Sequence, residues 1–505
     1  MNESMSRPAS SLPSRMPFIV SSGVEKADPT TRKLIRSHVM RGKKQKKRST
    51  AGLAPTYPIQ RPQVELREVI DIYTSVQPGR LGTRVYFVDF PAEIEPAMML
   101  KMAQVSAVAM RIIFPLLMEI GFHPDDNAWL YPTGRDVAAL HINAFAIQTF
   151  IDKVLRRQPE DVINPVATLH HQKGLKLLRE RLLGDDGSAK ISDDTISAVL
   201  KLASAAQFEG DVETAKHHMQ GLRQMADLRG GLDVFQDNPK FFVEIVRCDL
   251  GIALLANSDP VFYRQANEPI PEYPHQVASS FSRSVLSQEE MKFFQDLDED
   301  LVQNWLVTRK FCLLTNLSTQ TRMRMQPATI YGTMIAVMYR LLYMTFTAGS
   351  LDETIRLSLL AFTNHIFLQW QDVKPPCHHQ FRDAYRNYLQ IHALDTVPPQ
   401  LQLWLLMIGA ISIFDVSEDP WLSDYLRRQV KKCRINTWKD LQGILKSFMW
   451  IPLLDEKLGE EVYSSLTSQP SASVSKGDRY EYIQESKGVG TNTERSTTER
   501  DVNYN

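Results

Sequence analysis

Positive charge is concentrated near the N-terminus of the sequence. From Arg32 to Arg48 there are nine Lys or Arg and no Asp or Glu. Such a charge density suits contact with phosphate groups, acidic protein partners or nuclear import receptors. Basic runs also commonly stay solvated without a specific partner, so a solvating arm is the alternative interpretation.

A short helix is expected to carry the first half of this stretch. Asp28 suits an N-cap and Pro29 suits the first helical position, while Gly42 can end the last turn. These signals predict a helix at about 29–41. Its apolar face is expected to dock against another surface through Leu34, Ile35 and Val39.

The basic side chains divide into two groups with different expected tasks. The group on the helix is expected to contact phosphates or an acidic partner, and it consists of Arg32, Lys33, Arg36 and Arg41. The group after the helix is expected to serve nuclear import and non-specific affinity, and it consists of Lys43, Lys44, Lys46, Lys47 and Arg48.

An acidic stretch further along the chain begins like a calcium loop. Asp296, Asp298 and Asp300 alternate as the ligands of such a loop do. Leu301 stands where the loop requires Gly, however, and Val307 stands where it requires the closing Glu. We therefore interpret the stretch as an acidic helix N-terminus.

Histidine occurs in adjacent pairs that could suggest zinc. The pairs are His170-His171, His217-His218 and, after Cys377, His378-His379. Neighbouring positions on a helix point about 100° apart, so at most one member of each pair faces a given site. Because no second cluster lies at ligand spacing, we predict no metal centre and no cofactor.

The sequence lacks common enzyme motifs. It contains no G-x-x-x-x-G-K-[ST], no G-x-S-x-G, no H-E-x-x-H and no G-x-G-x-x-G after a strand. We predict a non-enzymatic protein, although a triad assembled only by the fold would escape a sequence pattern. The Met-rich and aromatic stripes at 327–347 and 401–414 predict core, with a ligand pocket between helices as the alternative.

Composition predicts a soluble intracellular protein without membrane contact. The first 60 of the 505 residues hold twelve Lys or Arg against three acids, so a basic arm precedes an acidic body. Four widely separated cysteines indicate a reducing compartment without a disulfide framework. The N-terminal segment lacks the apolar core of a secretory signal, and the apolar run at 403–414 is too short to span a bilayer.

Apolar residues at three-and-four spacing predict an all-α fold, since strand patterns are sparse. The expected helices span 97–121, 133–157, 165–183, 192–207, 211–228, 239–256, 287–315, 327–347, 351–371, 380–391, 399–416, 420–433 and 438–449. No helix pair recurs at a fixed period. The prediction is therefore an irregular multi-helix bundle with paired, solenoid-like helices.

Composition also divides the chain into four parts. Residues 1–55 are expected to form a disordered arm around the basic helix, and residues 56–96 a linker with the first short elements. Residues 97–466 are expected to form a helical domain, divided by a loop near 268–284. Residues 467–505, rich in Ser, Thr, Gly and Glu, are expected to form a disordered tail.

Seven segments of the sequence resemble a known protein family, and this resemblance does not follow from periodicity. They are RKLIRSHVMRGK at 32–43, HQKGLKLLRERL at 171–182, GD at 210–211, HMQGLR at 218–223, LRGGL at 228–232, IVRCD at 245–249 and PVF at 260–262. These segments resemble the fungal-specific transcription factor domain family over about 18–47 and 163–262. The resemblance implies an all-helical regulatory domain, associated with effector response, dimerisation or contact with other transcription proteins, and no catalytic residue.

The sequence departs from the family pattern before the regulatory domain. Many relatives carry a binuclear zinc cluster of six cysteines there, whereas no cysteine precedes Cys248. A zinc-cluster reader of base sequence is therefore missing. Direct contact with DNA would rest on the basic arm, which can grip phosphates without distinguishing bases.

These observations lead to three hypotheses. The leading one is a non-enzymatic fungal transcription regulator in the nucleus, working with other transcription proteins or as a homodimer or heterodimer. The alternative is a helical interaction scaffold unrelated to transcription. The third is a helical enzyme, which predicts a water-excluding pocket with convergent acid, base or nucleophile groups.

Overall fold

The structure is a computed structural model. It describes residues 98, 102, 105, 112–121, 136–156, 158–159, 162–265, 267–278, 292–368, 379–390, 397–416 and 419–467. All of these residues belong to one unit, Leu66–Asn505. The predicted basic arm with all its site residues, the linker at 56–96, the tail after residue 467 and the Cys377-His378 pair lie outside the described residues, so these expectations stay predictions.

Within the described part of the chain every element is a helix, and the all-α prediction is confirmed there. The elements of the first half are η2 (Leu117–Gly121), α4 (Val137–Thr149), η4 (Phe150–Leu155), α5 (Pro165–Leu183), α6 (Gly187–Lys190), α7 (Asp193–Glu209), α8 (Val212–Leu228), η5 (Leu232–Phe235) and α9 (Pro239–Ala256).

The elements of the second half follow in the same way. They are α10 (His275–Ala278), α12 (Glu299–Thr321), α13 (Pro327–Tyr343), α14 (Leu351–Thr363), η7 (Asn364–Leu368), α15 (His379–Gln390), α16 (Pro399–Ser412), α17 (Pro420–Lys432), α18 (Trp438–Phe448) and α19 (Pro452–Thr467). No described helix is both long enough and apolar enough to cross a membrane.

Caps and prolines determine where several helices begin. The side chain of Asn164 accepts hydrogen bonds from two backbone amides in the first turn of α5, and Pro165 occupies the first helical position. Asn238 and Pro239 start α9 in the same manner. The predicted bounds of α5 and α9 are confirmed because both start signals are local.

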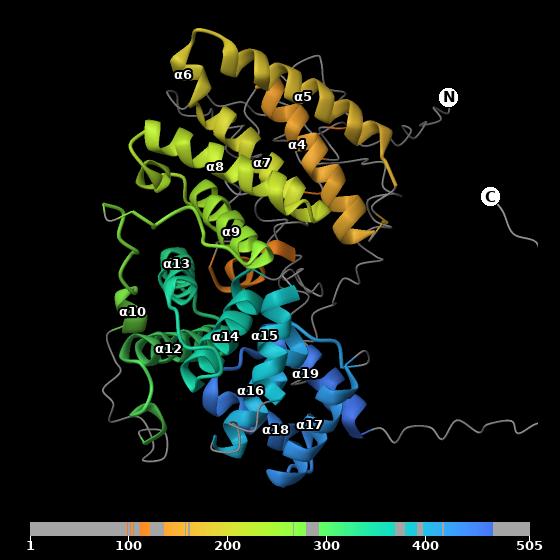
Figure 1. Ribbon diagram of the computed structural model, residues 1–505, viewed down its shortest axis with the longest axis vertical. Helices are drawn as coiled ribbons and strands as arrows, with labels where there is room; N and C mark the ends of the chain where they lie inside the picture. The colour runs from red at the N-terminus through yellow and green to blue at the C-terminus, as the bar shows by residue number, and fades with distance from the viewer. Residues whose placement is uncertain are drawn as a thin grey trace, which may run out of the picture. The chain divides into compact units, whose positions relative to one another are not determined.

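Helices of the first half pack in pairs. α4 packs against α5 and α7, and α7 packs against α8 (Figure 1). The backbones of α4 and α5 approach closely at Gly174, where a Cβ atom would lie 2.5 Å from Ile142 Cδ1. This arrangement agrees with the predicted pairing of helices.

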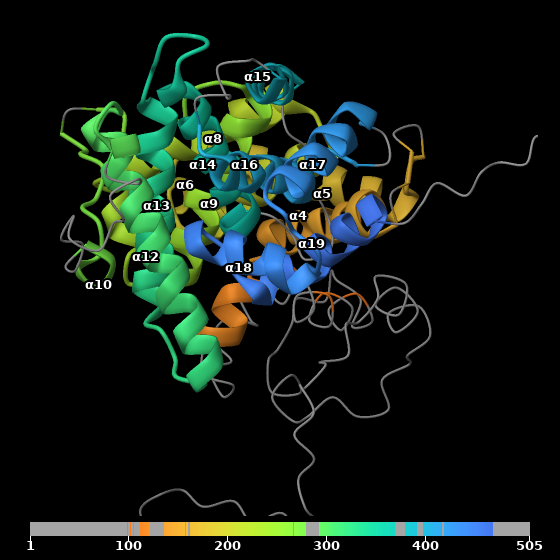
Figure 2. The ribbon, with the colours of Figure 1, turned by 90° about the horizontal axis from the view of Figure 1, so that it is seen from below.

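The second half packs around α16. Every residue from Leu401 to Ser412 is buried, and α16 contacts α14, α15, α17, α18 and α19 (Figure 2). Trp404, near the middle of α16, donates a hydrogen bond from Nε1 to the carbonyl of Met449 at 2.7 Å. The apolar stripe predicted at 401–414 is therefore core.

Several predicted boundaries differ from the structure; α13 ends at Tyr343 instead of residue 347, and α16 ends at Ser412 instead of residue 416. Residues His275–Ala278 form α10 inside the loop expected near 268–284. The helix expected at 287–315 is interrupted: residues 292–294 are helical, residues 295–298 are not, and α12 then starts at Glu299 after its cap Asp298 and continues to Thr321. α19 occupies Pro452–Thr467, where no helix is predicted, and it packs on α16 and α12.

Candidate ligand pocket

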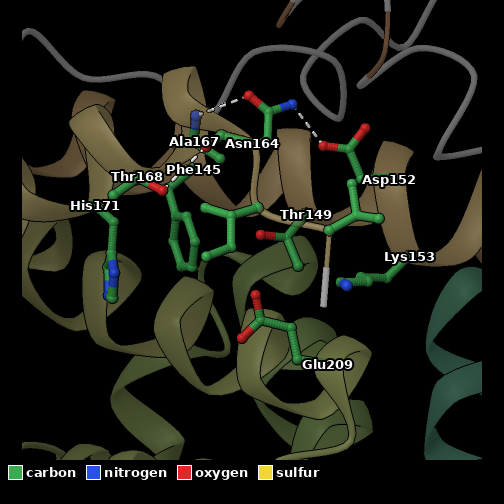
Figure 3. Close-up of a pocket in the computed structure, with 11 residues that line it drawn as sticks. Phe145, Thr149, Asp152, Lys153, Asn164, Ala167, Thr168, His171 and Glu209 are labelled. Carbon is green, nitrogen blue, oxygen red and sulfur yellow. Dashed lines mark hydrogen bonds between the residues drawn. The ribbon is translucent and has the colours of Figure 1, made fainter. Parts of the chain in front are cut away.

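A cavity of about 340 Å³ lies between η4, the start of α5 and the end of α7. It combines apolar side chains with a few polar groups, as ligand pockets commonly do. Its lining consists of Phe145, Thr149, Asp152, Lys153, Val162, Ile163, Asn164, Ala167, Thr168, His171 and Glu209. Figure 3 shows these side chains around the cavity.

One continuous helical segment supplies the first wall. Phe145, Thr149, Asp152 and Lys153 follow one another at spacings that place them on one helix face. The segment changes from α-helix to π-helix directly after Thr149. Single π-helical turns of this kind occur frequently at functional sites.

Asp152 is a buried anchor beside the cavity. Its carboxylate accepts hydrogen bonds from Gln148 Nε2 at 2.8 Å and from Asn164 Nδ2 at 2.7 Å. Arg156 Nη1 lies 3.2 Å from the other carboxylate oxygen and balances the charge. Because Asn164 also caps α5, Asp152 fixes the start of α5 against η4.

Glu209 supplies a second carboxylate at the opposite wall. It is the last residue of α7, and Gly210 turns the chain with a φ of 79°, a conformation that favours glycine. Glu209 is an exposed residue, but partial desolvation of its carboxylate raises the pKa of Glu209, while the charge of Lys153 lowers this pKa in part. The carboxylate points into the cavity (Figure 3), and it accepts no hydrogen bond within the described part of the chain.

Lys153 brings a positive charge to the same cavity. Its Nζ donates a hydrogen bond to the carbonyl of Pro159 at 2.7 Å. Among the described residues no ion pair joins Lys153 to Glu209, although the charge of Lys153 acts on the Glu209 carboxylate.

The histidines at 170 and 171 take different partners, as their helical spacing predicts. His171 lines the cavity and stacks on Phe145 with ring centroids 4.2 Å apart. His170 instead places Nδ1 2.8 Å from Nδ1 of His141. Burial lowers the pKa of His171. Burial also lowers the pKa of His218, and the charge of His171 lowers the pKa of His218 further. His171 therefore presents a neutral ring to the cavity near pH 7.

The calcium-like stretch has a structural role. Asp298 accepts hydrogen bonds from the backbone amides of Asp300 and Leu301 at 3.0 and 3.1 Å, which caps α12. The interpretation as an acidic helix N-terminus is confirmed. Across the described residues, no group of three or more His, Cys, Asp or Glu is arranged to hold a metal ion.

The pocket residues are not among the predicted site residues. The predicted site residues all lie in the basic arm, outside the described residues. The face formed by Phe145, Thr149 and Lys153 could have been found from its helical spacing. Glu209 could not, because only the packing of α7 against α4 and η4 brings it to that face.

Comparison of the chain with protein-family models, with curated proteins and with solved structures finds no match. The pocket itself offers a carboxylate, a hydroxyl, a neutral imidazole and an ammonium beside apolar side chains. Nucleophilic catalysis needs a nucleophile hydrogen-bonded to a base. Within the described residues, no hydrogen bond joins Thr149, His171 and Glu209.

Proposed function

We propose that the chain is a non-enzymatic transcription regulator of the fungal-specific transcription factor domain type, acting in the nucleus. The observation that carries this proposal is the run of nine basic residues without an acid from Arg32 to Arg48, joined to an all-helical body. In this proposal Arg32, Lys33, Arg36 and Arg41 contact phosphates or an acidic partner.

The segments that resemble the family support the proposal through their packing. Arg223 on α8 donates to the carbonyl of Val261 at 3.1 Å, and its guanidinium lies 5.1 Å from the ring centroid of Phe262. Asp249 on α9 accepts hydrogen bonds from the amides of Val261 and Phe262 at 2.9 and 3.2 Å. Residues quoted for the resemblance thus hold the helical body together, as expected for a regulatory domain without catalytic residues.

One observation favours the alternative of a scaffold outside transcription. The outer surface at the start of α5 carries exposed apolar side chains, among which Ile163 is 76% exposed and Leu169 is 50% exposed. Exposed apolar patches mark interaction surfaces. A partner that docks there could belong to transcription or to another process, so the location of the protein decides between the two functions.

The contact between the arm and nucleic acid is tested by salt-dependent binding of the full chain to duplex DNA. We expect the affinity to fall steeply with salt, by about one logarithmic unit per tenfold salt increase for each contacted phosphate. Replacing Arg32, Lys33, Arg36 and Arg41 by Gln should flatten that slope.

The matched control replaces four basic residues of the body, Lys173, Lys176, Arg179 and Lys439, by Gln and should leave the slope unchanged. An affinity that does not depend on salt, or a slope that the arm variant retains, would contradict a phosphate-binding role of the arm.

A further inference from the structure

In the cavity beside Glu209, negative charge is concentrated at the end of α7. Glu209 ends α7, where the last backbone carbonyls also present partial negative charge. Both features favour a positively charged group. The nearby ammonium of Lys153 donates to the carbonyl of Pro159 and forms no ion pair with Glu209 within the described residues, and the Glu209 side chain is exposed at the mouth of the cavity. The Glu209 carboxylate is thus available to a cation that enters the cavity.

The remainder of the cavity is suited to an apolar body. Phe145 and Ala167 are buried in its wall, and Val162 and Ile163 lie at its edge, where they are 44% and 76% exposed. Covering these two side chains would remove apolar surface from water, which is favourable. A ligand that reaches from Glu209 to Ile163 would meet charge at one end and apolar surface at the other.

A hydroxyl group completes the polar end. Thr149 is only 4% exposed, and Figure 3 shows its hydroxyl and the Glu209 carboxylate pointing into the same cavity. A primary ammonium group has three N–H donors. Two carboxylate oxygens and one hydroxyl oxygen are a matching set of acceptors.

We propose that this cavity binds a small molecule with a primary ammonium group on an aliphatic body. The ammonium pairs with Glu209 and donates to Thr149, and the aliphatic body rests on Phe145, Val162 and Ile163. This inference goes beyond the proposed transcription function and does not depend on it. Its failure would leave the basic arm and its role untouched.

The test uses the full-length protein and three probes of one length, namely hexylamine, hexanol and hexanoate, with binding measured by calorimetry at pH 7. We expect hexylamine to bind and hexanol to bind about two- to fivefold more weakly, because a charge pair with an exposed carboxylate contributes only modestly to binding. Hexanoate should bind more weakly than hexylamine, since its charge repels Glu209 and the Lys153 ammonium is already engaged by Pro159.

Two variants assign the binding to the pocket. Glu209→Gln keeps the shape of the side chain but removes its charge, and it should weaken hexylamine binding about two- to fivefold. Glu213→Gln removes an exposed carboxylate on α8 that pairs with Lys216 at 3.3 Å, and it should bind hexylamine like the wild type. Thermal unfolding of both variants checks that they fold alike.

Three outcomes would overturn the proposal. The first is an absence of hexylamine binding to the wild type. The second is equal binding of hexylamine and hexanoate, which would show that charge does not select the ligand. The third is unchanged hexylamine binding in Glu209→Gln, which would place the amine elsewhere on the chain.

Discussion

At the scale of single residues, Asp249 shows how a buried charge can hold a loop. It is 2% exposed, and it accepts hydrogen bonds from two loop amides and from the hydroxyl of Tyr339 at 2.8 Å. Burial raises the pKa of Asp249 from 3.8 to about 6, although the hydrogen bonds and the charge of Arg223 lower this pKa in part. Asp249 therefore joins α9, α13 and the loop after α9 into one polar contact.

The raised pKa of Asp249 predicts a pH-dependent stability. Because this pKa is higher in the folded state than the ordinary value of 3.8, protonation of Asp249 favours folding. The stabilisation is fully present below about pH 4 and is lost as the pH rises through about 6. Its size should be on the order of 3 kcal/mol.

Urea unfolding of the wild type and of Asp249→Asn between pH 4 and pH 8 measures this contribution. The free energy of unfolding of the wild type, minus that of Asp249→Asn, should decrease as the pH rises toward about 6 and then stay level. Asn does not titrate, so the difference isolates Asp249. A difference that is constant across this range would contradict the account of the buried carboxylate.

At the scale of elements, the contact between α4 and α5 positions the first wall of the pocket. Gly174 on α5 faces Ile142 on α4, and an added Cβ atom would lie 3.1 Å from the backbone nitrogen of Ile142. Backbone atoms cannot move aside as a flexible side chain can. The two helices can therefore pack at this distance only with glycine at position 174.

The close contact predicts opposite effects of the same substitution at two glycines. Gly174→Ala should lower the free energy of unfolding by about 1–3 kcal/mol, because overpacking outweighs the higher helix propensity of Ala. Gly221→Ala on α8, where an added Cβ atom would meet nothing within 4 Å, should raise it by up to about 1 kcal/mol.

Urea unfolding at one pH compares both variants with the wild type. Equal effects of Gly174→Ala and Gly221→Ala would show that helix propensity alone decides, and the close contact of α4 with α5 would then be wrong.

At the scale of the whole molecule, local signals predicted the fold and long-range packing determined the pocket. The starts of α5 and α9 were predictable because Asn and Pro stand at the two positions that begin a helix. The π-helical turn η4 was not, since it carries no comparable start signal in the sequence. The approach of Glu209 to Thr149 depends on how α7 packs on α4, which a one-dimensional pattern does not contain.

At the same scale, the predicted start of α12 was wrong and α19 was not predicted. The helix start expected at residue 287 followed apolar spacing, whereas the cap at Asp298 fixes the start of α12 at Glu299. The start of α19 at Pro452 follows a short connection after α18, and Asp455 in its first turn accepts a hydrogen bond from the amide of Ile451 at 2.6 Å. Both capping side chains and their backbone partners lie within four residues of each other in the sequence, so these two helix starts were predictable from local signals.

The most direct test of the central claim is the cellular location of the intact protein beside a variant with Lys43, Lys44, Lys46, Lys47 and Arg48 replaced by Gln. A nuclear regulator that depends on its basic arm predicts nuclear accumulation of the intact protein and loss of that accumulation in the variant. An intact protein that stays in the cytoplasm, or one that reaches the nucleus equally well without these charges, would contradict the proposed role of the arm.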